Sequence, residues 1–345
     1  MRNVKKVRIG ALEFGGGKIY VQSMLNVPAE NIPKSVEQAK TLEKAGCEII
    51  RAAVPRVEDV PLITALKNAV NVPIVADIHF DYKIALACVE AGVDKIRINP
   101  GNIGSAENVR KVADACRKNE VPIRIGVNGG SLEKELLAKY GKPTPEALVE
   151  SALNHVKLLQ ECDFDDIVIS IKSSDVKLTI AAYRMLAEKT SYPLHLGVTE
   201  AGTERMGIIK SSVGIGSLLC DGIGETIRVS LTADPLREVY AAKDILKVCG
   251  VGGGAEIVSC PTCGRTKIDL IRLAREVEDM LRGVDKPIKV AVMGCAVNGP
   301  GEAREADIGV AGGNGEGLLF KKGEILRKVP EDKILEELKK EIDLL

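Results

Sequence analysis

Three cysteines in the C-terminal third of the chain have the spacing of ligands for a metal centre. Cys260 and Cys263 are separated by only two residues, so both thiolates can turn toward one centre. Cys295 follows an apolar run and begins a loop at 295–301, whose glycines allow the backbone to approach a bulky ligand. Because thiolates bind soft metals, the pattern predicts a sulfur-rich metal or redox site.

Three chemistries are compatible with these cysteines. A redox dithiol would leave Cys295 without a role, and a thioredoxin-like motif should open a helix within a β-α-β unit. A structural zinc ion needs four closed ligands, yet no histidine follows His195 in the sequence. An iron–sulfur cluster takes cysteine thiolates and tolerates a substituted fourth ligand, and we favour this interpretation.

The fourth ligand of such a cluster has two candidates. Cys249 is close to Cys260 in the sequence but precedes a glycine-rich junction, and Glu302 follows Cys295 after a tight Gly-Pro-Gly segment. A carboxylate is a harder and more exchangeable ligand than a thiolate. A centre held by Glu302 could exchange that ligand for a substrate, which favours a catalytic cluster over a pure electron carrier.

Charged and polar residues end most of the apolar runs in the first two thirds of the chain. The cations are Arg51, Arg97, Arg124, Lys172 and Arg228. The other polar candidates are Asp77, His79, Asn128, Glu200 and Ser230. The carboxyl ends of parallel strands meet at one edge, so we expect these side chains to converge. In a protein without net charge, converging cations predict an anionic ligand, and arginine forks match phosphate oxygens.

The ligand that we expect at this edge is a small polyphosphorylated metabolite. A diphosphate carries enough oxygens to use several of the cations at once. Glu200 is the candidate general acid or base, because positioned carboxyl groups commonly do this work.

Eight short apolar runs must position these residues. They are 19–24, 48–54, 73–79, 95–99, 122–128, 166–173, 193–200 and 224–231. Segments with helical periodicity, such as 35–45, 83–91 and 106–118, separate most of them. Strands that alternate with helices predict a parallel sheet, and eight units fit a closed (β/α)₈ TIM barrel. An open, doubly wound sheet is the competing architecture.

A second domain follows a glycine-rich junction at 250–254. We predict a barrel domain at 1–246 and a small α/β domain at 250–345 that carries the three cysteines in loops. Its predicted elements are a helix at 268–281, strands at 288–293 and 306–311, a final hairpin that turns at 320–323, and a helix from about 331.

Composition excludes several classes of protein. Lys+Arg and Asp+Glu both number 48 among 345 residues, so the chain lacks the positive surplus of a general nucleic-acid binder. Six Tyr, four Phe and no Trp are too few for a base-stacking platform. With neither a signal peptide nor an apolar run long enough to cross a membrane, we expect a cytoplasmic protein. The cytoplasm is reducing and the number of cysteines, nine, is odd, and both facts argue against a framework of disulfide bonds.

Six segments, in order along both predicted domains, resemble the 4-hydroxy-3-methylbut-2-enyl diphosphate synthase family. They are 21–24, 95–104, 124–132, 195–202, 260–265 and 294–302. These enzymes belong to the non-mevalonate isoprenoid pathway and use an iron–sulfur cluster. The length is similar to that of the short bacterial two-domain form.

This resemblance implies a complete site. It implies a [4Fe-4S] cluster held by Cys260, Cys263, Cys295 and Glu302, with Asn298 beside it. It implies diphosphate contacts from Arg51, Arg97, Arg124, Lys172, Arg228 and Ser230. It also implies that Asp77, His79, Asn128 and Glu200 line the reacting carbons, with Glu200 supplying a proton.

The implied reaction is the reductive ring opening and dehydration of 2-C-methyl-D-erythritol 2,4-cyclodiphosphate to (E)-4-hydroxy-3-methylbut-2-enyl diphosphate. Electrons would come from reduced flavodoxin or ferredoxin, and the active site would form between the subunits of a head-to-tail homodimer. Two rival functions are a pterin-type barrel transferase with a structural zinc domain and a cluster-bearing redox sensor without a substrate pocket.

Overall fold

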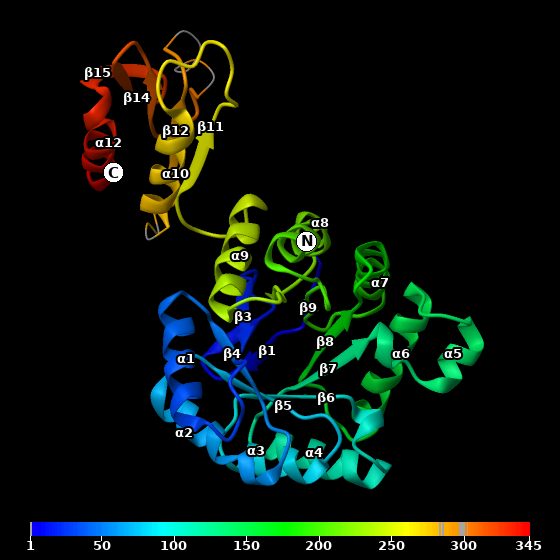
Figure 1. The fold of residues 1–345 in the computed structure, drawn as a ribbon. Coiled ribbons are helices and arrows are strands. Elements are labelled where there is room, and N and C mark those ends of the chain that lie inside the picture. Colours follow the sequence, from blue (N-terminus) through cyan, green and yellow to red (C-terminus); the bar gives the residue numbers. More distant parts are fainter. Residues whose placement is uncertain (1, 283, 285, 297–300, 302) are drawn as a thin grey trace. The chain divides into compact units, whose positions relative to one another are not determined.

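The computed structural model describes residues 2–282, 284, 286–296, 301 and 303–345. The chain divides into two compact units, Met1–Val251 and Gly252–Leu345, each with its own hydrophobic core. Figure 1 shows the strands of the first unit surrounded by helices. Among the described residues, no helix is long and apolar enough to cross a membrane.

The first unit is a parallel barrel of eight strands, which confirms the predicted TIM barrel over the open sheet. The strands are β3 (Tyr20–Met24), β4 (Ile49–Ala53), β5 (Ile74–Asp77), β6 (Lys95–Ile98), β7 (Ile123–Asn128), β8 (Ile167–Lys172), β9 (His195–Leu196) and β10 (Thr226–Ile227). Their order is β8-β7-β6-β5-β4-β3-β10-β9, and a bridge between Ile169 and Leu194 joins the two end strands. The ring is therefore closed, with the carboxyl ends of the strands at one rim.

Helices follow the strands around the barrel (Figure 1). They are α1 (Ile32–Lys44), α2 (Pro61–Ala69), α3 (Tyr82–Glu90), α4 (Ala106–Lys118), α5 (Lys134–Tyr140), α6 (Pro145–Gln160), α7 (Val176–Lys189), α8 (Glu204–Cys220) and α9 (Pro235–Val248). Local sequence fixes their ends. Ser105, Thr144 and Asp175 cap first turns through their side chains, and Gly46 and Gly92 adopt positive φ where the chain turns back toward a strand.

An N-terminal hairpin, which the sequence pattern does not predict, closes the opposite end of the barrel. Its strands are β1 (Val7–Ile9) and β2 (Leu12–Phe14). Val7, Ile9 and Phe14 are buried against residues of β3, β4, β5 and β8, among them Tyr20. Ligands therefore have access only from the carboxyl-end rim in the part of the barrel that the structure describes.

The second unit is a five-stranded mixed sheet with helices packed on it. Its elements are β11 (Glu256–Ser259), α10 (Leu270–Leu281), β12 (Lys289–Met293), β13 (Ile308–Gly312), β14 (Glu316–Lys321), β15 (Glu324–Pro330) and α12 (Ile334–Asp343). Strands β11, β12 and β13 run parallel, and β14 and β15 form the final hairpin. Strand β11 was not predicted. It matters because it sets Cys260 at the same sheet edge as Cys295.

Candidate active site and cluster ligands

A cavity lies at the carboxyl-end rim of the barrel. We call it the anion cavity. It is lined by Arg51, Arg97, Arg124, Gly126, Asn128, Ser170, Lys172, Thr199, Arg228 and Ser230. All five cations predicted from the strand ends line it, together with Asn128 and Ser230. The hydroxyl groups of Ser170 and Thr199 were not predicted.

Asp77 links the cations on two strands. Arg51 Nη2 donates to Asp77 Oδ2 over 2.5 Å, and Arg97 Nη1 donates to Oδ1 over 3.3 Å. His79 Nε2 lies 3.4 Å from Asp77 Oδ2, and its Nδ1 lies 3.3 Å from Arg97 Nη1. Burial favours the neutral acid, but Arg51, His79 and Arg97 outweigh it and hold the pKa of Asp77 far below its usual range. Asp77 is therefore a fixed negative charge that orients two arginines.

Neither Arg124 nor Lys172 forms an ion pair with an acid in the described part of the chain, although Asp77 attracts Arg124 from a distance. Arg124 is 1% exposed, and its Nε and Nη1 have no hydrogen-bond partner among the described residues. Burial, followed by repulsion from neighbouring arginines, lowers the pKa of Arg124 and of Lys172. Burial of a cation without a neighbouring acid costs free energy, and an anion that binds from the rim would offset this cost for Arg124 and Lys172.

Two glycines leave room for the cations. A Cβ at Gly126 would lie 2.5 Å from Nε of Arg97, and a Cβ at Gly197 would lie 2.9 Å from Nζ of Lys172. Any larger residue would displace a charged group from the cavity. Gly126 lies within β7 and Gly197 directly follows β9, and a glycine at such a position is the sequence signal for this role. Both glycines lie within segments that carry the family resemblance.

Glu238, on α9, is a functional residue that the sequence analysis missed. It is 3% exposed, and its Oε1 lies 3.3 Å from Arg228 Nη2. Its carboxylate also accepts from Ser23 Oγ and from the backbone N–H of Leu231. Glu238 thus fixes Arg228 at the rim. An acid within a helical pattern carries no local sign of this contact, so only the tertiary structure identifies it.

Glu200 lies beside the anion cavity. A hollow lined by Asn128, Gly129, Gly130, Pro143, Ser173, Ser174, Thr199 and Glu200 shares two residues with that cavity. Glu200 is exposed and has a φ of +51°, a left-handed conformation that is rare outside glycine. Strained backbone of this kind concentrates at functional sites, and here it lies at the hollow that adjoins the anion cavity.

Lys95 is buried in the barrel beneath the anion cavity. It is fully buried, Nζ has no hydrogen-bond partner in the described part of the chain, and the ammonium lies 5.0 Å from the centre of the Phe14 ring. Burial, followed by repulsion from Arg124 and Arg51, lowers the pKa of Lys95 well below its usual value. In the unfolded chain Lys95 is exposed and binds its proton more tightly than in the folded chain. At neutral pH this difference favours the unfolded state, so Lys95 lowers the free energy of unfolding.

Replacement of Lys95 by methionine is accordingly expected to raise the free energy of unfolding at pH 7 by about 1–4 kcal/mol. The gain should shrink as the pH rises toward the ordinary lysine pKa of 10.5, because the unfolded chain then also loses the proton. Urea denaturation at several pH values measures this. Lys111→Met, at an exposed ion pair on α4, should change stability by less than about 0.5 kcal/mol. A Lys95→Met variant less stable than the parent would contradict the conclusion that buried Lys95 lowers the stability of the fold.

The cysteines lie at the carboxyl edge of the second unit's sheet. Cys260 directly follows β11, Cys295 follows β12, and these strands are parallel neighbours. The backbone N–H of Gly294 donates to Cys260 Sγ over 3.2 Å. Hydrogen bonds from the backbone and side chain of Arg265 lower the pKa of Cys263, which favours the thiolate. Ala291, Met293 and Ala306 form an apolar layer against Cys260.

These observations fit a sulfur-ligated centre, because amide donors to sulfur and an apolar shell are what stabilise one. Among the residues that the structure describes, however, no three His, Cys, Asp or Glu side chains are already gathered as metal ligands. Glu302, predicted as the fourth ligand, and Asn298 lie outside the described residues.

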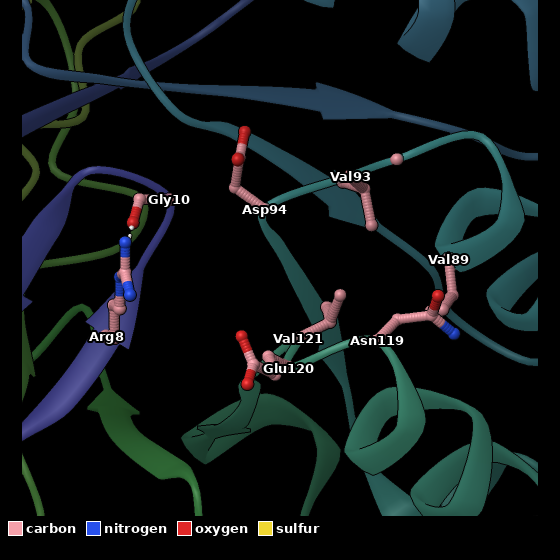
Figure 2. Close-up of a pocket in the computed structure, with 9 residues that line it drawn as sticks. Arg8, Gly10, Val89, Val93, Asp94, Asn119, Glu120 and Val121 are labelled. Atoms are coloured by element: carbon pink, nitrogen blue, oxygen red, sulfur yellow. Dashed lines mark hydrogen bonds between the residues drawn. The ribbon is translucent and has the colours of Figure 1, made fainter.

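A further hollow lies on another part of the first unit (Figure 2). It is lined by Arg8, Gly10, Val89, Gly92, Val93, Asp94, Asn119, Glu120 and Val121. Arg8 Nε donates to the carbonyl of Gly10, and Asp94 is occupied by Lys67 and the N–H of Ile74. Its lining contains one cation, Arg8, beside the acids Asp94 and Glu120, so this hollow does not have the character of the anion cavity.

A barrel whose carboxyl-end rim gathers five cations, with Arg124 and Lys172 outside any ion pair that the described residues form, has the site of an enzyme for a phosphorylated small molecule. The chain belongs to the GcpE family. Residues 4–243 match the GcpE TIM-barrel domain, and residues 256–344 match the GcpE protein C-terminal domain.

Similar proteins agree with this assignment. A protein of Clostridium perfringens is 58% identical over 346 residues, which cover 100% of this chain and 99% of that protein. One of Geobacillus kaustophilus is 57% identical and covers 99% of this chain and 92% of that protein. Both are named 4-hydroxy-3-methylbut-2-en-1-yl diphosphate synthase (flavodoxin), which confirms the predicted family, and the chain is an enzyme of that family.

Solved structures support the barrel fold alone. Dihydropteroate synthase of Stenotrophomonas maltophilia is similar with a TM-score of 0.52 and 16% identity, over 70% of this chain and 96% of that one. A phospho-2-dehydro-3-deoxyheptonate aldolase of Thermotoga maritima has a TM-score of 0.51 and 12% identity, over 72% of each chain.

Proposed function

We propose that the anion cavity binds the diphosphate of 2-C-methyl-D-erythritol 2,4-cyclodiphosphate and that the enzyme opens this ring reductively. The observation that carries the proposal is Arg124, a buried guanidinium with unpartnered nitrogens among four further cations in the described cavity lining. The reaction consumes two electrons and two protons and yields (E)-4-hydroxy-3-methylbut-2-enyl diphosphate and water. Conversion of the cyclic diphosphate by the anaerobically purified enzyme with reduced flavodoxin tests it.

The cations act both on binding and on bond cleavage. Arg124 and Lys172 provide donors from the depth of the cavity, while Arg97 and Arg51 are held at fixed angles by Asp77. When the carbon–oxygen bond of the ring breaks, negative charge collects on the diphosphate. Donors that are already oriented stabilise this charge without reorganisation, which lowers the barrier.

Glu200 supplies the proton that carries away the hydroxyl group as water in this proposal. Its carboxyl group lines the hollow adjoining the cavity, and its backbone is held in a left-handed conformation. Asn128 lines both spaces and is suited to orient the carbons between them. His79, next to Asp77, lies within reach of the same rim.

The cofactor in this proposal is a [4Fe-4S] cluster held by Cys260, Cys263, Cys295 and Glu302, with Asn298 beside it. When bound, such a cluster passes single electrons to the substrate and acts as a Lewis acid. The chain contributes thiolate ligands, the amide donor of Gly294 and an apolar layer that limits water. Residues 1–246 form the substrate domain and residues 250–345 the cluster domain.

Partners follow from the same proposal. The electron donor is flavodoxin, which the relatives' names include, with ferredoxin as the alternative. We place the enzyme in the cytoplasm, where such donors occur, as a head-to-tail homodimer in which one subunit's cluster domain completes the partner's barrel. Full specific activity of a monomer at high dilution would contradict the dimer.

Glu200→Gln should lower kcat about 100-fold or more, because an amide cannot donate the proton that leaves with water. The visible spectrum of the cluster should stay unchanged, since Glu200 belongs to the barrel. Steady-state kinetics with reduced flavodoxin and the absorption spectrum measure both. Glu204→Gln, which removes an exposed ion pair on α8, is the matched control. Equal turnover in the two variants would remove Glu200 from the proton step.

A further inference from the structure

Two cysteines outside the proposed cluster ligands lie side by side on neighbouring helices. Cys220 is the last residue of α8 and is exposed, and Cys249 caps the end of α9 and is half-buried. Cys249 Sγ lies 3.8 Å from the carbonyl oxygen of Gly216, one helical turn before Cys220. Besides burial, the neighbouring Cys220 thiol also contributes to a raised pKa of Cys249, as expected for two thiols that lie next to each other. Packing of α8 on α9 therefore places the two cysteines next to each other, with Cys249 at the Gly216 carbonyl and Cys220 one helical turn beyond it.

Gly216 borders the Cys249 sulfur. A Cβ at position 216 would lie 3.4 Å from Cys249 Sγ, which is close contact, so the glycine leaves the sulfur room against the helix. Both cysteines belong to the first unit and lie before the glycine-rich junction at 250–254. They differ in accessibility, since Cys220 is the more open of the two to a reagent in solution.

We propose that Cys220 and Cys249 form a redox-active dithiol that closes to a disulfide when it meets an oxidised low-molecular-weight thiol. The exposed Cys220 thiolate attacks the reagent's disulfide and releases one thiol. Cys249 then attacks the sulfur of Cys220 and releases the second thiol, which takes up the proton that the Cys249 thiol loses. Two cysteine thiols lose two electrons and one external disulfide gains them.

The order of the two steps follows from the surroundings of the thiols. Burial, and then the neighbouring Cys220 thiol, raise the pKa of Cys249, which makes it a poor first nucleophile. Once formed, the bond ties the end of α9 to α8. Because α9 carries Glu238, which fixes Arg228, the disulfide stabilises one side of the anion cavity and the last turn before the junction.

Equilibration of the holoenzyme with oxidised glutathione, followed by alkylation of free thiols, tests the proposal. Cleavage after glutamate gives peptides 205–225 and 239–256, which contain Cys220 and Cys249 as single cysteines and separate them from the cluster ligands. We expect one linked pair of these peptides, lighter by about 2 Da than the two thiols because two hydrogens are lost. The Tm should rise by about 3 °C or more.

Cys220→Ser and Cys249→Ser should each abolish the linked peptide, whereas Cys162→Ser, at a buried cysteine elsewhere in the barrel, should retain it. A stable glutathione adduct on Cys220 with Cys249 alkylated would overturn the proposal. A disulfide between Cys220 and any cysteine other than Cys249 would also overturn it. The same holds if both peptides are recovered alkylated after equilibration at a glutathione potential that oxidises ordinary protein dithiols. Because activity is not the readout, the test is independent of the proposed reaction.

Discussion

Replacement of Arg124 by methionine is expected to raise KM for the cyclic diphosphate about 100-fold or more, with a smaller loss in kcat. Arg124 is the most deeply buried arginine of the anion cavity, and two of its nitrogens have no acceptor among the described residues. Hydrogen bonds to charged groups contribute about 1.5–3 kcal/mol each, so the loss of two corresponds to a factor of roughly 10² to 10⁴. Steady-state kinetics and calorimetric titration with the substrate measure the effect.

The folded state of this variant should be at least as stable as the parent, because methionine removes a buried charge for which burial and repulsion from Arg51 and Arg97 outweigh the attraction of Asp77. A rise in Tm together with the loss of affinity would separate binding from folding. Arg184→Met is the matched control, since Arg184 forms an exposed pair with Asp221 on the helical face. If Arg124→Met bound substrate as tightly as this control, the anion cavity would not be the diphosphate site.

The barrel was predictable because its strands are short apolar runs at regular intervals, separated by amphipathic helices. The runs at 95–99 and 122–128 correspond to β6 and β7, and the predicted helix at 106–118 coincides with α4. Parallel strands buried on both faces carry this signal with little interference from solvent. Because the carboxyl ends of such strands share one rim, the convergence of Arg97 and Arg124 from separate strands was predictable as well.

Features that depend on contacts between distant segments were not predictable. The hairpin of β1 and β2 has only three residues in each strand, and its register depends on packing under the barrel. Glu238 lies within an ordinary helical pattern and acquires its role only because α9 packs beside β3 and Arg228. Strand β11 is partly exposed along its length, so its apolar signal is weak.

Replacement of Cys295 by serine is expected to abolish the cluster and, with it, all turnover. Serine is a harder and far less acidic ligand than cysteine, so it does not replace a thiolate on iron. Iron should fall from about four per chain, the content of a [4Fe-4S] centre, to below about one. Iron and sulfide analysis, with visible absorption, measures this independently of activity. The barrel should still bind the cyclic diphosphate, because its cations belong to the other unit.

Cys220→Ser is the matched control for this substitution, because it changes an exposed cysteine of the barrel unit and should leave the iron content unchanged under reducing conditions. Equal iron in the two variants would remove Cys295 from the ligand set. The alignment of Cys260 and Cys295 at the ends of neighbouring parallel strands would then need another explanation, such as a dithiol. Loss of iron with substrate affinity retained would instead show that binding and electron transfer are carried by separate parts of the chain.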